Sequence, residues 1–573
     1  MRALLLLALS IVSALATDII PTARYNPWWQ HAGIRGGIPV RDTIYITLSS
    51  TVTVAQLNAH LDACPSNQVV KLLDGTYSFS TTVSIDKSGV TLRGEGTNTV
   101  LRDTSSGNAL TAFVKVGNGP GEYFDGRYGT FSETAITAGA VQWSSNITVS
   151  STAGLSVGKL IGIDGEADGT IISATGNGGY LTRPTTRAYS EYTTIVAING
   201  NDLTIEPPLI GPLWTNATSE EVFWDTTAHT EMSGVENLKV VSVNGSASAK
   251  FLVHINLARN CWAKGIHTEN GGRAQIATEF ASNAEVRGCY VCNWSSFLSS
   301  FYGIEMRHSS HGRVEDNIID NHSNPYMCPS VSGTVYAFNY NTNDNFQLGG
   351  GSQSWHIFGH GGHSHMNLIE GNHFWDVVFE RTEGYTDSTV VLRNRITCED
   401  QGSTGFGVRM MGGHRFISFV GNVLGTSTGE LLDGNAVTAV FDWDDDENGD
   451  ARNNSAVTNT LILYKNWFAP VSTNNGVRYY NDTINTYNAA AGEDIPTSYA
   501  YPNGQPSWWP CGTNWPPYDP LTQGSSPASG MALPAGYRYR NMNVEMTNLP
   551  ACAGGDIGGP LGRPKIRGVR LRR

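Results

Sequence analysis

Short runs of alternating apolar and polar residues recur through the second half of the chain, and they predict β-strands. From Ser233 onward a similar short β-strand motif recurs. Examples are ENLKVVSV, SNAEVRGCYV, GRVEDNII, TVYAFNYN, NLIEGNHF, VVLRNRIT, SFVGNVLG and LILYKNWF. No segment of this region keeps a helical period of about 3.6 residues for three turns, which argues against a helical repeat.

An asparagine occupies the same position in each of the later strand motifs, and the spacing of these asparagines gives the length of the repeat. These asparagines are Asn317, Asn339, Asn372, Asn394, Asn422 and Asn466. Successive members are 22, 33, 22, 28 and 44 residues apart, and the earlier Asn237, Asn260 and Asn283 are 23 apart. A step of this size with insertions predicts one coil of a parallel β-solenoid, and the 44-residue step would then be two coils.

Asparagine suits the bend between two strands of such a coil for two reasons. It tolerates a left-handed backbone conformation, and its side-chain amide can bond to the asparagine one coil away. We therefore expect the asparagines of the ladder to be structural.

Three other patterns flank the repeats. Residues 53–65 have the cap, the apolar spacing and the terminal proline of one short helix, which would cover the open end of the stacked sheets. Residues 140–215 predict a β insertion with a hairpin turning at Asn199-Gly200. Residues 485–573 hold 12 of the 24 prolines, which predicts an irregular segment that wraps the solenoid.

The first residues, MRALLLLALSIVSALA, have the basic start, apolar stretch and small-residue cleavage site of a secretory signal. We expect residues 1–16 to be removed on export. No later segment approaches about 18 uninterrupted apolar residues, so no membrane span is expected. The predicted organisation is a signal peptide (1–16), a cap with first coils (17–139), a β insertion (140–230), the main solenoid (231–484) and the irregular segment (485–573).

The net charge limits the kinds of binding partner, and the cysteines raise the questions of disulfides and a metal site. The formal charge of −13 and the pI near 5.5 argue against a nucleic-acid surface, although six of the last eleven residues are basic and could contact an acidic surface or polymer. Export would permit disulfides among the eight cysteines, and the sequence does not choose a pairing. Cys289 and Cys292 match half of a zinc site, but no second such pair follows.

The stretch HLDACPSNQVVKLLDGTYSFSTTVSIDKSGVTLRGEG resembles the opening of the pectate lyase and polygalacturonase superfamily. The asparagine-bearing coils and the later SYAYPNGQPSWWPCGTNWPPYDP resemble secreted polygalacturonase-like proteins. The resemblance covers most of the chain and implies an all-β fold, the right-handed parallel β-helix. It specifies the chemistry less well, because that fold carries lyases, hydrolases, epimerases, esterases and non-catalytic adhesins.

The family motifs of polygalacturonases are only partly present. Residues 341–344 resemble the first motif, Asn-Thr-Asp, and residues 359–361 the third, Gly-His-Gly. No aspartate pair lies between them, and residues 395–397 read Arg-Ile-Thr where the family has Arg-Ile-Lys. Pectate lyase chemistry would instead need calcium-binding carboxylates and a basic residue beside the sugar, and no family motif supplies them here.

Histidines form the sharpest cluster, since ten of the fourteen lie between residues 254 and 373. If the coils are in register, residues 307–312 fall on the same side as residues 359–365 and form a band of imidazoles. Three roles remain open for the band: acid-base or substrate contact, metal binding, and packing with each ring bonded to the backbone. The glycines of GHGGHSH allow a ligand to approach the backbone and favour a functional role.

We therefore predict a site around this band. The expected catalytic residues are His360, His363, His365, Asp344, Glu370, Glu380 and Arg381. The expected substrate-binding residues are Arg393, Arg409, Trp355, Trp375, Tyr385, His308 and His311. Carboxylates matter because glycosidases use two, arginines could bind an acidic sugar, and aromatic rings stack on pyranose faces.

A separate acidic loop, FDWDDDENGDARNN, is a candidate for weak Ca²⁺ binding through Asp444, Asp446 and Asn448. These residues match the early positions of an EF-hand loop, but Ser455 stands at its last position. The sequence establishes no cofactor, and Ca²⁺ is the candidate that we retain. The predicted function is a secreted polysaccharide-degrading enzyme, with glycoside hydrolysis ahead of β-elimination on a uronic-acid polymer. The third alternative is a non-catalytic carbohydrate-binding or adhesive solenoid.

Overall fold

The computed structural model describes the solenoid and the elements packed on it. The described residues are 19–107, 110–119, 131–166, 183, 187–216, 219–244, 249–293, 301–322, 324–342, 355–360, 362–380, 384–397, 407–424, 441–442, 460–464, 466–468, 486–487, 494–509, 515–520 and 533–540. The predicted signal segment and Ca²⁺ loop residues lie outside them.

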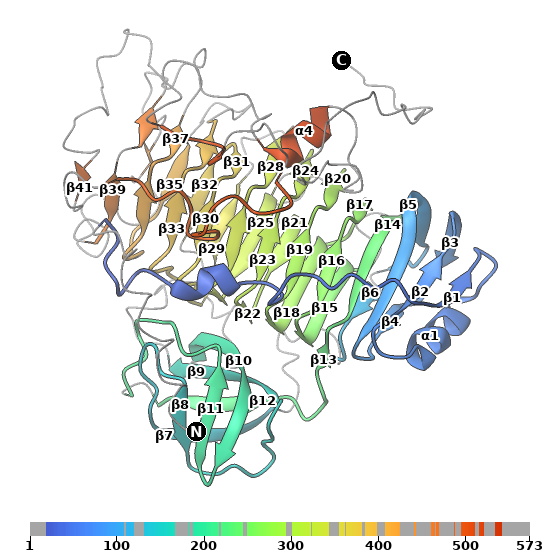
Figure 1. Cartoon of the computed structure of the whole chain (residues 1–573), viewed down its shortest axis with the longest axis horizontal. Coiled ribbons are helices and arrows are strands. Elements are labelled where there is room, and N and C mark those ends of the chain that lie inside the picture. Colours follow the sequence, from blue (N-terminus) through green and yellow to red (C-terminus); the bar gives the residue numbers. More distant parts are fainter. Residues whose placement is uncertain are drawn as a thin grey trace, which may run out of the picture.

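The chain forms a right-handed parallel β-helix in which most coils contribute one strand to one sheet and two strands to another (Figure 1). We call the 13-stranded sheet of the described residues sheet B. Its strands are β4 (Val83–Ile85), β6 (Ala112–Val116), β13 (Thr230–Glu231), β15 (Phe251–Arg259), β18 (Ala274–Ser282), β21 (Tyr302–Met306), β22 (Ser309–Ser310), β25 (Asn324–Pro329), β26 (Val331–Ser332), β29 (Ile357–His360), β32 (Val377–Phe379), β35 (Val408–Met410) and β38 (Phe441–Asp442).

The other sheet, sheet A, has 22 strands within the described residues. They are β1 (Ile44–Leu48), β2 (Gln68–Leu72), β3 (Gly75–Phe79), β5 (Val90–Asp103), β14 (Gly234–Ser242), β16 (Trp262–Lys264), β17 (His267–Glu269), β19 (Glu285–Arg287), β20 (Tyr290–Cys292), β23 (Arg313–Glu315), β24 (Ile318–Asp320), β27 (Val335–Ala337), β28 (Tyr340–Thr342), β30 (Leu368–Glu370), β31 (His373–Phe374), β33 (Val390–Leu392), β34 (Arg395–Ile396), β36 (Ser418–Val420), β37 (Val423–Leu424), β39 (Ile462–Tyr464), β40 (Trp467–Phe468) and β41 (Thr486–Tyr487).

The core consists of columns of apolar side chains, one residue from each coil. One such column on sheet A runs through Val286, Val314, Tyr336, Ile369, Val391, Phe419 and Leu463. All of these side chains are buried in one cluster. Because strands alternate their side chains between two faces, the residues between the core positions point outward.

The asparagine ladder is confirmed for the six later residues. In each step the backbone N–H and the side-chain amide of one asparagine donate to Oδ1 of the asparagine in the next coil, at 2.9–3.0 Å. Every member is buried. The ladder therefore satisfies backbone groups at the bend between the two strands of sheet A.

Three details of the repeat prediction are wrong. Asn422 bonds directly to Asn466 and β36 pairs with β39, so the 44-residue step is one coil with an insertion. The left-handed residue at the bend is the one before the ladder asparagine, for example Phe338 at φ +57°. Asn260 and Asn283 are left-handed themselves, and they follow β15 and β18, at the turn from sheet B to sheet A.

Further segments pack against the solenoid. Helix α1 (Val54–Ala63) lies where the sequence predicts it, and Thr53 and Gln56 form its capping box. The N-terminal segment, with the short helix η1 (Pro27–His31), runs along the solenoid, and helix α4 (Pro534–Arg540) packs near β24 (Figure 1). None of the described helices is long and apolar enough to cross a membrane.

Between β6 and β13 the chain leaves the solenoid and forms a closed barrel beside it (Figure 1). The barrel strands are β7 (Ser132–Ala138), β8 (Asn146–Val149), β9 (Leu160–Glu166), β10 (Arg187–Asn199), β11 (Asp202–Glu206) and β12 (Glu221–Trp224). The predicted hairpin at Asn199-Gly200 joins β10 and β11. Tyr192 of β10 packs on Phe280 of the solenoid, and its N–H donates to Ser310 Oγ at 2.8 Å.

The cysteines that the structure describes, Cys64, Cys261, Cys289, Cys292 and Cys328, are unpaired and buried. Burial raises the pKa of the Cys261 and Cys289 thiols to about 12. They behave as apolar core residues, and the expectation of disulfides is not met at these five positions.

Candidate functional site

Seven ionisable side chains lie together on the outer face of sheet B, and we call them the sheet-B cluster. They are His254, Arg273, Glu279, Glu305, Arg307, His360 and Glu380. Their strand neighbours Ile255, Ile276, Ile304 and Phe358 point into the core instead. Register pairs His254 with Ala277 and Ala277 with Glu305, so that His254 and Glu305 lie in one column, two coils apart.

Two arginines link the carboxylates of the cluster. Arg307 lies between Glu279 and Glu305, with its Nη2 3.5 Å from Glu279 Oε1 and its Nη1 3.7 Å from Glu305 Oε1. Arg273 donates to both oxygens of Glu305, at 2.9 and 3.2 Å. Such paired bonds hold a guanidinium and a carboxylate in one plane. On the other side of Glu279, His254 Nε2 lies 3.6 Å from Glu279 Oε2.

His360 and Glu380 form the other half of the cluster. His360 ends β29, Glu380 follows β32, and His360 Nδ1 is hydrogen-bonded to Glu380 Oε1. The backbone N–H of Glu380 also donates to Gly359 O at 3.2 Å, which fixes the two strands next to each other. The structure thus brings together two residues of the predicted catalytic set.

Burial and the arginines set the charges of the cluster. Burial alone would raise the pKa of Glu305, but Arg273 and Arg307 outweigh it and lower that pKa to about 2. Burial lowers the pKa of His360 to about 3, and Arg273 acts in the same direction. Burial and Arg307 likewise lower the pKa of His254 to about 3. Near neutral pH the site thus holds an ionised Glu305 and two neutral imidazoles.

The accessible edge of the cluster is formed by Arg273 and His360. Their side chains keep 16% and 12% of their surface exposed, whereas Glu279, Glu305 and Arg307 keep none. Further along the same sheet, Arg409 stacks on the half-buried Trp355, with 5.4 Å between the guanidinium carbon and the ring centre. A ligand along sheet B would meet these guanidinium groups, one imidazole and one indole.

His363 and His365 do not belong to this cluster, which corrects the predicted catalytic set. His363 Nε2 is bonded to Asp387 at 2.9 Å, and His365 Nε2 to Glu191 of the barrel at 3.1 Å. The His365 ring also stacks on Tyr189, with 4.4 Å between ring centres. Both histidines are buried where the barrel meets the solenoid, so they hold the two parts together.

The predicted band of imidazoles exists, but it lies at turns of the coils. The coils are in register as expected, since Ser310, Ser332 and His365 pair in sequence. His308 and His311 are buried residues with φ of +40° and +56°, and burial lowers their pKa values to about 3 and 4. Neither position is open to substrate, which corrects their predicted binding role.

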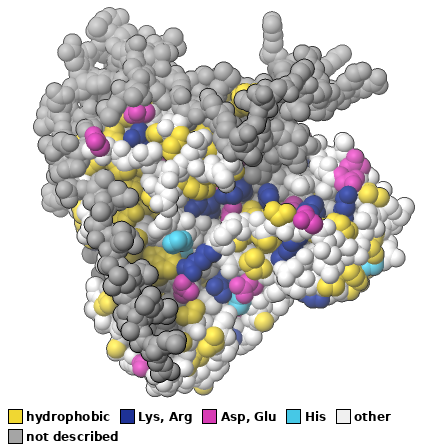
Figure 2. Space-filling model, in the orientation of Figure 1, with side chains coloured by type: hydrophobic (Ala, Val, Ile, Leu, Met, Phe, Trp, Pro, Cys, Tyr) yellow, Lys and Arg dark blue, Asp and Glu magenta, His cyan; other side chains and the backbone are white. Residues whose placement is uncertain are grey.

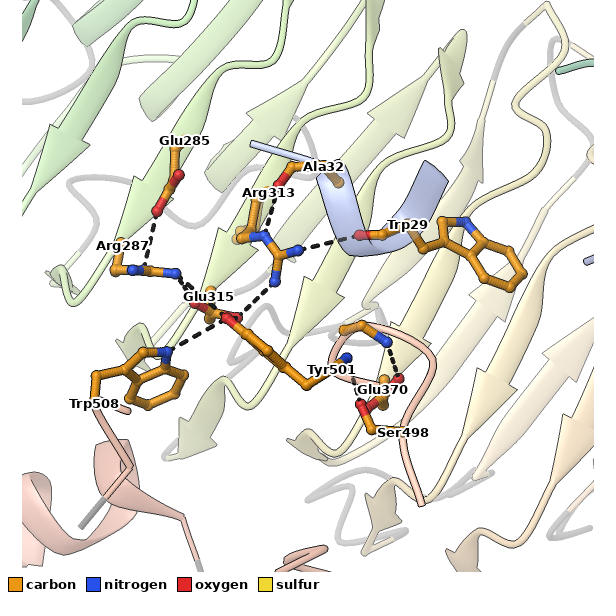
Figure 3. Close-up of polar contacts among 12 residues, drawn as sticks. Trp29, Ala32, Glu285, Arg287, Arg313, Glu315, Glu370, Ser498, Tyr501 and Trp508 are labelled. Carbon is orange, nitrogen blue, oxygen red and sulfur yellow. Dashed lines mark hydrogen bonds and ion pairs between the residues drawn. The ribbon is translucent and has the colours of Figure 1, made fainter. Parts of the chain in front are cut away.

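Glu370 and Arg393 hold the C-terminal segment against sheet A. Glu370 accepts hydrogen bonds from the Ser498 hydroxyl and from the backbone N–H groups of Tyr499 and Ala500 (Figure 3). Arg393 donates to the carbonyls of residues 495, 496 and 518. Their predicted roles in catalysis and substrate binding are replaced by this structural one.

We expect Glu370→Ala to loosen the C-terminal segment, because two backbone N–H groups and one hydroxyl would lose their buried acceptor. The change should lower the free energy of unfolding by about 2 to 4 kcal/mol. Limited proteolysis followed by mass spectrometry should show new cleavage within residues 494–509. Unchanged resistance to protease would show that Glu370 does not hold the segment. The exposed Glu166 of the barrel, changed to Ala, is the control.

The remaining predicted residues are scattered. Trp375 and Tyr385 are half-buried, and Tyr385 packs edge-on against His414 with 6.0 Å between ring centres. Asp344, Arg381, Asp444, Asp446 and Asn448 lie outside the described residues. Their predicted roles, including weak Ca²⁺ binding, remain predictions.

Five members of the cluster, His254, Arg273, Glu279, Glu305 and Arg307, were missed as site residues. The sequence does contain an indication of two of them: a charged residue within a strand whose other residues are mostly apolar or small. Glu279 stands in AQIATEFAS and Glu305 in FYGIEMR, and each is fully buried. A buried carboxylate needs a partner, so both positions could have been singled out.

No family model matches the sequence, and no curated protein matches it either. Several solved structures of tailspikes are similar in fold. Tailspike gp61 of Pseudomonas phage phi297 has a TM-score of 0.48 and 10% identity, over 65% of this chain and 58% of that one. The Gp54 tailspike of Acinetobacter baumannii bacteriophage AP22, solved with an A. baumannii capsular saccharide, has a TM-score of 0.45 and 13% identity, over 66% and 56%.

The tailspike of E. coli bacteriophage HK620, solved with a pentasaccharide, has a TM-score of 0.36 and 12% identity, over 70% of this chain and 57% of that one. The matched part of the chain thus spans little more than half of each of these tailspikes.

Proposed function

We propose that this protein cleaves a uronic-acid polysaccharide by β-elimination at the sheet-B cluster. The observation that carries the proposal is the pair His360–Glu380 at the accessible edge of a cluster that also presents Arg273. A neutral imidazole held by a carboxylate can act as a general base, and a guanidinium can bind the carboxylate of the sugar.

The reaction would use these groups as follows. Arg273 binds the uronate carboxylate and makes the neighbouring C5 proton more acidic. His360 Nε2 is buried in the structure, so the ring must shift to meet the sugar. It then takes that proton, the electrons of the C5–H bond form the C4–C5 double bond, and the C4–O bond breaks. The departing sugar oxygen takes a proton from solvent. Glu380 accepts the Nδ1–H of the ring, so it selects the tautomer with the lone pair on Nε2 and stabilises the imidazolium that forms.

Hydrolysis is the second candidate, since three carboxylates, Glu279, Glu305 and Glu380, share the cluster. Glycosidases use one protonated and one ionised carboxyl group. Glu305 is held ionised by its arginines and could serve only as the base. Elimination needs no protonated carboxyl group, and for this reason we place it first. Binding without cleavage is the third candidate.

One assay on purified protein separates the three. Polygalacturonate, alginate and hyaluronate are incubated with the protein, and both new reducing ends and the ultraviolet absorbance of unsaturated products are followed. We expect both to rise together on at least one polymer. Reducing ends without the absorbance would mean hydrolysis, and retention of polymer without either product would mean a binding protein. Inertness towards all three polymers would contradict the proposal.

A further inference from the structure

A groove of about 860 Å³ lies on sheet A, away from the sheet-B cluster. Strands β19 and β23 form its floor, and η1 with the residues after it forms one wall. Residues 500–508 form the other wall, and Glu206 of the barrel borders it. Figure 2 shows Lys and Arg side chains gathered on the face along which the N-terminal segment runs. The volume is typical of small-molecule sites.

The floor is a fixed network of opposite charges (Figure 3). Arg287 pairs with Glu285 and Glu315, and Arg313 donates to Glu315 at 2.9 Å. The Tyr501 hydroxyl donates to Glu315 at 2.6 Å. Burial would raise the pKa of Glu315, but Arg287 and Arg313 outweigh it and lower that pKa. Glu315 is therefore held ionised between the two arginines.

The walls supply two indole rings. Trp28 and Trp508 are half-buried and line the groove from opposite segments. Each carries a guanidinium on its ring, Arg35 at 4.9 Å from the Trp28 ring centre and Arg287 at 5.7 Å from that of Trp508. Flat apolar faces beside charged hydrogen-bonding groups match a pyranose, which has an apolar face and a polar rim.

Most of the groups in the groove that can still form hydrogen bonds to a ligand are donors. Glu285 already accepts from the N–H of Ile34 at 3.0 Å and pairs with Arg287, and Glu315 accepts from two arginines and a tyrosine. By contrast, none of the contacts of Arg287 within the described residues uses its Nη1. Arg35 bonds to Glu206 through Nη1 alone, and its side chain is 42% exposed.

From these observations we propose that the groove is a second saccharide site, which binds an acidic oligosaccharide without cleaving it. Uronate rings lie against Trp28 and Trp508, and the uronate carboxylates bind Arg35 and Arg287. The site goes beyond the proposed function, because it lies on the other sheet and its carboxylates are already engaged. It would hold a polymer on the protein while the sheet-B cluster acts elsewhere on the chain.

The test is isothermal titration calorimetry of the full-length protein with trigalacturonate and, for contrast, with maltotriose. We expect trigalacturonate to bind with a Kd on the order of 1 mM or tighter and maltotriose to bind at least about tenfold more weakly. Trp28→Ala and Trp508→Ala should each weaken trigalacturonate binding about tenfold or more. Arg35→Gln should weaken trigalacturonate binding and leave the weak maltotriose binding unchanged.

Controls keep this result separate from the proposed function. Trp143→Ala removes a half-buried tryptophan of the barrel outside the groove and should leave binding unchanged. His360→Ala, in the sheet-B cluster, should also leave groove binding unchanged whether or not the protein is a lyase. Thermal melting of each variant shows that it is folded. Absence of trigalacturonate binding, or binding that survives all three groove variants, overturns the inference.

Discussion

His360→Ala is expected to lower the rate of polysaccharide cleavage by about 10²- to 10⁴-fold, the usual contribution of a general base. His360 has the base position because Glu380 bonds its Nδ1 and burial keeps the ring neutral. The measurement is kcat/KM on the polymer that the product assay identifies. Thermal melting checks that the variant is folded, because removal of the ring leaves the buried Glu380 carboxylate without this partner.

The Glu380→Gln variant tests whether catalysis needs the charge of Glu380 in addition to its hydrogen bond to His360. The amide oxygen of glutamine can still accept the Nδ1–H, but the charge that stabilises the imidazolium is lost. We expect kcat to fall and KM to stay unchanged. Cleavage by wild type should be lost only as the pH falls toward the lowered pKa of His360, about 3, and its acid limit should therefore lie well below pH 6.5.

The matched control is His60→Ala, in the last turn of α1 and far from the cluster. It should leave kcat and KM as in wild type. If His60→Ala and His360→Ala reduce cleavage equally, or if His360→Ala cleaves normally, His360 is not the base and the site lies elsewhere.

The fold could be predicted from the sequence because a solenoid repeats its local pattern. Each coil places an apolar residue in the same column, and the ladder asparagine marks the same bend. The repeat length can therefore be recognised in the sequence without knowledge of any long-range contact. Whether a longer spacing is one coil with an insertion or two coils cannot be recognised in this way. Asn422 and Asn466 are direct neighbours, and only the pairing of β36 with β39 distinguishes one long coil from two short ones.

The sequence predicted only part of the site. Which residues belong to the site depends on which face of each strand points outward. A shift of one residue in a strand moves a side chain from the core to the surface. His360 and Glu380 were found because glycines and a histidine cluster drew attention to them. Glu279 and Glu305 were missed because each stands alone among residues that read as an ordinary strand.

The histidine stretch itself could not be interpreted without the barrel. His365 bonds to Glu191, a residue 174 positions earlier in the chain, and only the docking of the barrel brings them together. No periodicity in the sequence encodes that contact. The band of imidazoles therefore looked functional as a whole, although only His360 reaches the sheet-B cluster.

Glu191→Ala is expected to give the largest loss of stability, about 3 to 5 kcal/mol in the free energy of unfolding. The carboxylate is buried where the barrel meets the solenoid and accepts hydrogen bonds from four donors. These are the N–H groups of Ile210 (2.9 Å) and Gly211 (2.7 Å), Trp214 Nε1 (2.5 Å) and His365 Nε2 (3.1 Å). Removal of the carboxylate leaves all four without this acceptor in a buried site.

The pH dependence of stability gives this prediction a second measurement. Burial would raise the pKa of Glu191, but the bonds from His365, Trp214 and Ile210 outweigh it and lower the pKa below 4.5. A carboxylate with a lowered folded-state pKa stabilises the protein fully above its unfolded pKa, and this contribution is lost as the pH falls through the folded value. The stability gap between wild type and Glu191→Gln should therefore be widest near neutral pH.

Denaturant unfolding at neutral pH and at about pH 3 measures that gap, with the exposed Glu166→Gln of β9 as control. We expect the control to stay within about 0.5 kcal/mol of wild type at both pH values. A gap for Glu191→Gln that is equally wide at both pH values would mean that shape, and not charge, holds the barrel on the solenoid. In that case the charge of Glu191 would have no role in docking, and the packing of Tyr189 and Tyr192 would have to account for it.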